Sequence, residues 1–219
     1  MKAFKKIMIT AVALVAAMSV MTGCIKYEDP NQAARDQASA AQSEYEAMVA
    51  QVEGGIHHVE IDVQDYGTIS VELDGDTAPI TVDNFLKLAE SGFYNGLTFH
   101  RIIDGFMIQG GDPEGTGMGG SDETIIGEFA SNGIENNISH VRGVISMARN
   151  GQDMNSASSQ FFIVQTDTLS LDGDYAAFGH VTDGMDIVDA ICDDVVNTDN
   201  NGGVAPEDQP VITEIRVID

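Results

Sequence analysis

Tryptophan is absent from the 219 residues of this chain, and cysteine occurs only twice, at Cys24 and Cys192. Two cysteines so far apart do not form a disulfide framework. Cationic side chains are also scarce: ten Lys and Arg stand against 35 Asp and Glu, and the formal net charge is −25. A phosphate-binding surface needs clustered Lys and Arg, so this balance argues against a nucleic-acid partner. The acidic residues are spread through turns, which favours a solubilising surface over a binding function.

The N-terminal hydrophobic run is too short to span a bilayer, which needs ~20 apolar residues. Residues 7–21 form an uncharged run of 15 residues, preceded by Lys2, Lys5 and Lys6. A positive start, a short apolar stretch and small residues before a cleavage site are the three parts of a secretory signal peptide. The pattern therefore predicts a signal peptide over residues 1–23.

The segment closes on Met21-Thr-Gly-Cys24, which resembles the lipobox of bacterial lipoproteins, although Met21 stands where that pattern most often has Leu. After cleavage of a lipobox the cysteine becomes lipid-modified and N-terminal. Attached acyl chains contribute ~0.8 kcal/mol per CH₂ to membrane binding. The resemblance implies a lipid anchor at Cys24 and a location on the extracytoplasmic side of a bacterial cell membrane. The alternative is an ordinary signal peptide, cleaved elsewhere, with Cys24 incidental.

Residues 24–55 separate this anchor from the rest of the chain and are rich in Ala, Gln, Asp and Glu, which predicts a helical spacer. Apolar side chains recur there at intervals of three and four, at Ala34, Ala38, Ala41, Tyr45, Met48 and Val52. This seam consists mostly of alanine and buries little area. We favour a solvated spacer and a monomer, while self-association and packing on the domain stay open as alternatives.

Alternating apolar and polar residues at 57–63 and 68–73 predict a β-hairpin with one buried face. Thr81 can cap a helix that ends at Gly92. Further short strands are expected near residues 97–101, 106–110, 143–148, 161–165, 178–181 and 211–218, with a second helix at 185–191. Eight strands and two helices predict a mainly β domain over residues 56–219, built as a closed eight-stranded antiparallel β-barrel capped by two α-helices.

Several separated motifs in this domain occur in one order. They are Ala-Pro-Ile-Thr-Val-Asp-Asn-Phe at 78–85, Gly-Phe-Tyr-Asn-Gly-Leu-Thr-Phe-His-Arg at 92–101, Gly-Val-Ile-Ser-Met-Ala at 143–148, Ser-Ser-Gln-Phe-Phe-Ile-Val at 158–164 and Phe-Gly-His-Val at 178–181. Together they resemble the cyclophilin family of peptidyl-prolyl isomerases from about Val59 to Ile218. The resemblance implies an eight-stranded barrel with a helix at each end, an active groove on its outer wall, and proline-containing polypeptides as substrates.

Isomerisation of an X-Pro bond crosses a rotation barrier of ~18–20 kcal/mol between forms that differ by only ~0.5–1 kcal/mol. The reaction needs no nucleophile, metal or cofactor, and we expect none. It needs a group that stabilises the twisted amide, in which the lone pair has returned to nitrogen. A fixed cationic donor near that nitrogen acts more strongly on the transition state than on the ground state.

The resemblance assigns this catalytic donor to Arg101. It implies a proline pocket of Phe106, Met107, Phe162 and Leu171, substrate-peptide contacts from Gln109 and the backbone of Arg149, and a groove bordered by His100, Ala148, Gln160 and Tyr175. Two of these positions depart from the family pattern: Arg149 replaces a common Asn, and Tyr175 replaces a frequent His. Ser170, next to Leu171, replaces a frequent Trp. Asp104, in the turn before Phe106, replaces a frequent Pro.

Other sequence motifs give weaker indications of function. The glycine-rich run 110–120 looks like a phosphate loop but lacks the Gly-Lys-Ser/Thr ending, so a wall of the groove is the better interpretation. No Gly-x-Ser-x-Gly elbow surrounds Ser156, Ser158 or Ser159, which argues against a hydrolase. The five histidines show no metal-ligand spacing. The competing functional hypothesis is a binding module that holds proline-containing chains without useful turnover.

Overall fold

The computed structural model describes residues 31–219. The chain divides into two units, residues 1–41 and 42–219. Helix α1 (Gln32–Val49) begins in the first unit and ends in the second, and none of its residues is buried. No helix among the described residues is both long enough and apolar enough to cross a membrane. The predicted signal peptide and the predicted anchor at Cys24 lie outside the described residues.

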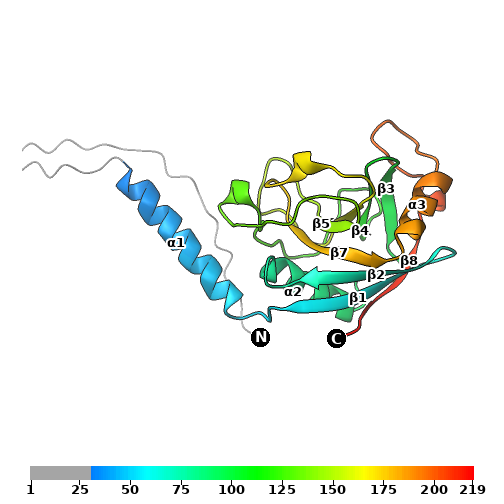
Figure 1. Cartoon of the computed structure of the whole chain (residues 1–219). Coiled ribbons are helices and arrows are strands. Elements are labelled where there is room, and N and C mark those ends of the chain that lie inside the picture. Colours follow the sequence, from blue (N-terminus) through cyan, green and yellow to red (C-terminus); the bar gives the residue numbers. More distant parts are fainter. Residues whose placement is uncertain (1–30) are drawn as a thin grey trace, which may run out of the picture. The chain divides into compact units, whose positions relative to one another are not determined.

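The second unit is built on one antiparallel sheet in the strand order β3-β4-β6-β5-β7-β2-β1-β8 (Figure 1). The strands are β1 (Ile56–Val63), β2 (Gly67–Asp74), β3 (Thr98–Ile103), β4 (Met107–Asp112), β5 (Val144–Met147), β6 (Phe161–Val164), β7 (Ala177–Asp183) and β8 (Ile212–Val217). Each strand lies within two residues of a range that the sequence predicts. The mainly β class is therefore confirmed.

The hairpin of β1 and β2 shows why alternation locates the strands. In β1, Val59, Ile61 and Val63 are buried, while the residues between them are partly exposed. Successive side chains of a strand point to opposite faces, so one face of this hairpin enters the core. Asp65 in the connecting turn takes a left-handed φ of 66°, a conformation that Asp tolerates better than most residues.

The two ends of the sheet meet only along a short seam. Segment 202–212 runs beside the edge of β3 that does not pair with β4. The amide of Ile102 donates to the Gly202 carbonyl at 2.8 Å, and the amide of Ile212 donates to the Leu97 carbonyl at 2.8 Å. Among the described residues, the pairing of β3 with this segment consists of isolated bridges, Thr98 with Val211 and Arg101 with Gly203, and no continuous ladder joins β3 to β8. The fold is therefore a half-barrel with a seam, whereas the sequence predicted full closure.

Two local features account for the incomplete ladder at this seam. The pairing of β3 shifts register between Thr98 and Phe99 and again between Phe99 and Arg101, and such bulges bend a strand and interrupt its hydrogen bonding. Pro210, two residues before the first residue of β8, has no amide hydrogen to donate.

Helices α2 (Pro79–Glu90) and α3 (Met185–Asp194) are the two that the sequence predicted for the domain, and α2 packs on β8 while α3 packs on β2. Phe85 of α2 anchors the aromatic core, with ring centroids 5.1 Å from Tyr94, 5.4 Å from Phe161 and 5.3 Å from Phe178. Cys192 of α3 is buried as expected, and burial raises the pKa of its thiol to about 12.

The N-terminus of α2 is capped by a residue that is remote in the sequence. Thr81 was expected to cap this helix, but the helix begins at Pro79 and its N-cap residue Ala78 makes no side-chain hydrogen bond. Instead the buried carboxylate of Glu128 accepts from the amides of Ile80 at 3.1 Å and Thr81 at 2.8 Å, and from the Thr81 hydroxyl at 2.6 Å. Burial raises the pKa of Glu128, and these hydrogen bonds reduce that upward shift without cancelling it.

The hydroxyl of Tyr45, near the end of α1, donates to the same carboxylate at 2.9 Å. Glu128→Gln is expected to lower the unfolding free energy by about 1–3 kcal/mol, because buried amide donors lose a charged acceptor. Tyr45→Phe removes one donor and is expected to cost about 1 kcal/mol. Urea denaturation of the three proteins measures both changes. Equal midpoints for Glu128→Gln and the parent would show that this carboxylate does not stabilise α2.

Candidate active site

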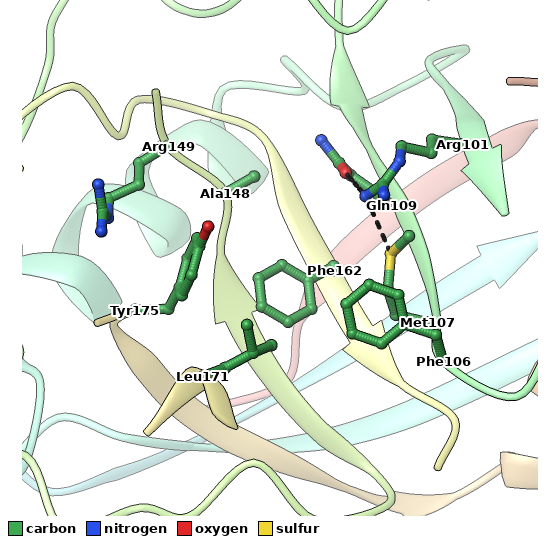
Figure 2. A pocket seen from close by; sticks show the side chains of 9 residues that line it. All are labelled: Arg101, Phe106, Met107, Gln109, Ala148, Arg149, Phe162, Leu171 and Tyr175. Atoms are coloured by element: carbon green, nitrogen blue, oxygen red, sulfur yellow. Dashed lines mark hydrogen bonds between the residues drawn. The ribbon is translucent and has the colours of Figure 1, made fainter. Parts of the chain in front are cut away.

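A cavity of about 210 Å³ opens on the face of the sheet turned away from the main core. Alternation along β4 and β6 produces this face, because Ile108 and Ile163 point into the main core while Met107 and Phe162 belong to a second, smaller cluster. The cavity is lined by Arg101, Phe106, Met107, Gln109, Ala148, Arg149, Phe162, Leu171 and Tyr175 (Figure 2). Nine of the eleven residues that the sequence assigned to the site therefore come together.

Strand pairing places the central side chains in one row. Arg101 of β3 pairs with Gln109 of β4, and Gln109 pairs in turn with Phe162 of β6. Residues that lie directly opposite in antiparallel strands have Cβ atoms ~4.5–5.5 Å apart and share a face. The row thus runs from a guanidinium through an amide to an aromatic ring within two strand spacings.

The apolar half of the cavity is built around Phe162, which is 5% exposed. Its ring meets the edge of Tyr175 at 6.0 Å and 85° and stacks on His140 at 6.1 Å and 16°. Leu171, from a 3₁₀-helix at Leu169–Leu171, and Phe106 border the same space (Figure 2). These side chains leave a small apolar hollow of the kind that accepts a compact ring.

The polar half is a chain of oriented hydrogen bonds. Arg101 donates from Nη1 to Gln109 Oε1 at 3.1 Å and from Nε to the Asn201 carbonyl at 2.8 Å. Gln109 donates from Nε2 to Gln160 Oε1 at 2.8 Å, and Gln160 donates to the Gly119 carbonyl at 2.7 Å. The guanidinium is thereby held in one orientation. Burial lowers the pKa of Arg101, which Tyr175 and Asp199 oppose, but an arginine stays cationic in proteins.

Gln160 lies in an adjoining hollow of about 410 Å³ instead of the central cavity. Gly117, Met118 and Gly119 line this second hollow, so the glycine-rich run 110–120 forms a wall of the groove, as the sequence indicated. Asp112 holds that wall by accepting from the amides of Glu114, Thr116 and Gly117. Burial favours the neutral form of Asp112, but these hydrogen bonds prevail and lower its pKa.

His100 was expected to border the groove, and it lies beside the wall of the second hollow. The side chain is 5% exposed and lines neither hollow. The register shift between Phe99 and Arg101 leaves His100 without a partner in the ladder, and its ring packs beneath the 112–119 loop near Gly117. Burial lowers the pKa of His100, nearby Arg101 adds to this shift, and Asp112 opposes it.

Known proteins that resemble this chain agree with this arrangement of residues. The model of the family described as cyclophilin type peptidyl-prolyl cis-trans isomerase/CLD matches residues 58–217. The chain belongs to the cyclophilin family. Its enzyme class is therefore that of a peptidyl-prolyl cis-trans isomerase.

Similar proteins occur in both fungi and bacteria. A peptidyl-prolyl cis-trans isomerase-like 1 protein of the fungus Rhizopus delemar is 47% identical over 136 residues, which are 62% of this chain and 79% of the relative. A peptidyl-prolyl cis-trans isomerase of Helicobacter pylori is 46% identical over 127 residues, 57% of this chain and 74% of the relative.

A solved cyclophilin-type isomerase of Cryptosporidium parvum superposes with a TM-score of 0.66 at 32% identity, and the match covers 75% of this chain and 99% of that one. A second structure of that protein, determined in the presence of the dipeptide Ala-Pro, gives a TM-score of 0.65.

This cyclophilin also has a buried polar group beneath Phe162 that the sequence reasoning missed. His140 is fully buried, with Nδ1 2.9 Å from Asp172 Oδ1 and Nε2 3.0 Å from the Ser146 hydroxyl. Nothing in the sequence marks these three residues as neighbours, because they come from a loop, a strand and a 3₁₀ turn. Burial lowers the pKa of His140, and Asp172 opposes that shift.

These two buried histidines predict acid sensitivity. Since the pKa values of His100 and His140 are lowered on folding, the unfolded chain binds more protons just below its histidine pKa of ~6.5. Their stabilising contribution is complete above that pH and is lost as the pH falls further. The raised pKa of Glu128 has the opposite effect on stability, because the folded chain then binds the proton more tightly and gains stability as the pH falls. Denaturation at several pH values should show a shallower loss for His140→Gln than for the parent, and identical slopes would contradict this.

Proposed function

We propose that this cyclophilin accelerates cis-trans isomerisation of X-Pro bonds in exported proteins and so assists their folding at a membrane surface. Arg101 is the proposed catalytic residue, and the proline ring is proposed to sit on Phe162 between Phe106, Met107 and Leu171. The observation that carries the site assignment is the row Arg101–Gln109–Phe162, which puts a held guanidinium beside an apolar hollow.

The hydrogen bonds of Arg101 support its role. Nε and Nη1 are occupied by Asn201 and Gln109, whereas Nη2 donates to nothing within residues 31–219. A guanidinium that is already oriented, and that keeps one donor for substrate, stabilises the twisted imide without reorganising during the reaction. Burial of the cation strengthens this electrostatic effect, because the local dielectric is lower than that of water.

The peptide on either side of the proline needs backbone partners, and two are available. The main-chain amide and carbonyl of Arg149 take part in no hydrogen bond in the described part of the chain, so both can pair with a substrate strand. The Gln109 amide, fixed between Arg101 and Gln160, supplies a side-chain contact. Ala148, Gln160 and Tyr175 border the path, and no metal or cofactor takes part in the proposed reaction.

A binding module with the same groove would retain these contacts without turnover. A protease-coupled assay with a proline peptide separates the two functions, since only the trans form is cleaved quickly and catalysis appears as an accelerated slow phase. We expect acceleration that is proportional to protein concentration. Saturable peptide binding with no acceleration would favour the binding module.

The proposed setting is a lipoprotein, with a signal peptide at 1–23, a spacer at 24–55 anchored at Cys24, and the isomerase domain at 56–219. Support comes from the Met21-Thr-Gly-Cys24 sequence and from helix α1, which covers 18 residues of the spacer and has no buried side chain. At 1.5 Å per residue this helix is about 27 Å long. We propose that the protein acts as a monomer and reaches its substrates on the extracytoplasmic side of a bacterial membrane.

Cys24→Ser tests the anchor. The variant cannot form a thioether to lipid, so it is expected to stay unprocessed or to leave the membrane fraction, while the parent remains with the membrane. Fractionation and mass spectrometry of the mature N-terminus measure the outcome. An unmodified mature N-terminus at another residue would refute the lipoprotein assignment and favour an ordinary signal peptide.

A further inference from the structure

The cationic side chains of this acidic protein are distributed unevenly. Residues 31–219 hold six of the ten Lys and Arg: Arg35, Lys87, Arg101, Arg142, Arg149 and Arg216. Three of them pair with carboxylates, Lys87 with Asp83 at 2.6 Å, Arg142 with Asp189 at 2.6 Å and Arg216 with Glu60 at 2.5 Å. In the described part of the chain, Arg101 and Arg149 form no ion pair, and both line the proposed proline cavity.

Arg149 is held in place by neutral groups. Its Nε donates to the Asp174 carbonyl at 2.8 Å and its Nη1 to the Asn150 carbonyl at 3.1 Å. Its Cζ lies 5.1 Å from the centroid of Phe129 and 4.9 Å from that of Tyr175. The side chain is half-buried, and Nη2 makes no hydrogen bond within residues 31–219. A fixed, uncompensated positive charge with a free donor therefore lies at the site.

The position of this charge relative to the proline pocket is defined by Tyr175, whose ring lies between the Arg149 guanidinium and Phe162 (Figure 2). Tyr175 is 6.0 Å from Phe162 and 4.9 Å from Arg149. At about 3.3 Å per residue of extended chain, these two steps correspond to roughly two or three residues of bound peptide. Arg149 also lines the second hollow, so a peptide that crosses both hollows passes it.

We propose that the Arg149 side chain makes this enzyme prefer substrates with an Asp or Glu two or three residues from the isomerised proline. This rests on the proposed function, since it assumes that the bound proline occupies the pocket at Phe162. A carboxylate accepts charge-assisted hydrogen bonds from a guanidinium, which are stronger than neutral ones. Elsewhere the net charge of −25 repels acidic chains, so this contact supplies attraction that the rest of the surface does not.

The contact lies away from the imide, which determines how the preference appears in kinetics. Arg149 binds ground state and transition state alike, so its effect belongs in KM, with kcat unchanged. Peptides with one proline and Glu, Gln or Lys at the second and third residues on each side provide the test. For the parent we expect kcat/KM about fivefold higher for Glu than for Gln at one of these positions, the scale of an exposed ion pair.

Arg149→Gln should remove this preference, so that kcat/KM becomes equal for the Glu and Gln peptides. Lys87→Gln removes the same charge from the exposed face of α2 and should retain the preference. Equal kcat/KM for Glu and Gln peptides in the parent, or a Glu preference that survives Arg149→Gln, would overturn the inference. If the parent turns over no peptide, the proposed function fails separately, and calorimetric binding of the same peptides still decides whether Arg149 selects a carboxylate.

Discussion

Replacing Arg101 with alanine is expected to lower kcat/KM by about 10²–10³, the scale observed when one preorganised transition-state donor is removed. The loss should appear in kcat and kcat/KM together, because the donor acts on the twisted imide and contributes little to ground-state binding. The structure gives the reason for so large an effect: Gln109 and Asn201 orient the guanidinium before substrate binds.

Arg101→Lys is the informative companion variant. Lysine keeps the charge but not the planar fork, so it cannot hold Gln109 and Asn201 while donating to substrate. We expect most of the activity to be lost in this variant as well, with a melting temperature near that of the parent in both. A near-normal rate for Arg101→Ala would remove this residue from the mechanism.

Phe162→Ala is expected to act on stability and on catalysis together. The ring is 5% exposed and contacts both His140 and Tyr175, so its removal leaves a cavity and should cost about 3–5 kcal/mol of unfolding free energy. The proline ring would also lose its main apolar surface. A buried side chain of this type contributes ~1.5–3 kcal/mol, so kcat/KM should fall by roughly one to two orders of magnitude in the fraction that remains folded.

Val164→Ala separates the two effects. Val164 is buried on the same face of β6 but does not line the cavity. Its truncation should lower stability and leave kcat/KM of the folded protein unchanged. Phe162→Leu keeps an apolar side chain and should recover part of both losses. If Phe162→Ala retained the parental kcat/KM when assayed well below its melting temperature, the proline pocket would have to lie elsewhere.

Local patterns predicted most of the fold because they report on local geometry. Alternation located the hairpin of β1 and β2, and the two domain helices begin within three residues of the expected positions. Part of the lining of the cavity followed from the family motifs at 92–101, 143–148 and 158–164, which include parts of β3, β5 and β6. What failed depended on long-range contacts: Glu128 caps α2 from 47 residues away, and His140 meets Asp172 across 32 residues.

The burial of His100 was not predictable, for a different reason. Strict alternation along β3 would give neighbouring residues opposite faces, but the register shifts around Phe99 break the count, and no residue type in this stretch signals them. A glycine or proline would have marked an irregularity. The partial closure of the barrel was missed for the same reason, since the seam depends on how those bulges bend β3 toward residues 202–212.

That seam gives the molecule an uneven resistance to local unfolding. β6, which carries Phe162, is hydrogen-bonded to a strand on both sides, whereas the outer edge of β3, which carries Arg101, is bonded only to the irregular segment 202–212. Amide hydrogen exchange should therefore be faster at Leu97–Ile102 than at Phe161–Val164, since segments with fewer regular contacts open at lower free energy. Arg101 and Phe162 thus lie in parts of the sheet with unequal regular hydrogen bonding, and local opening at the edge of β3 is expected to displace Arg101 while the apolar surface at Phe162 stays folded.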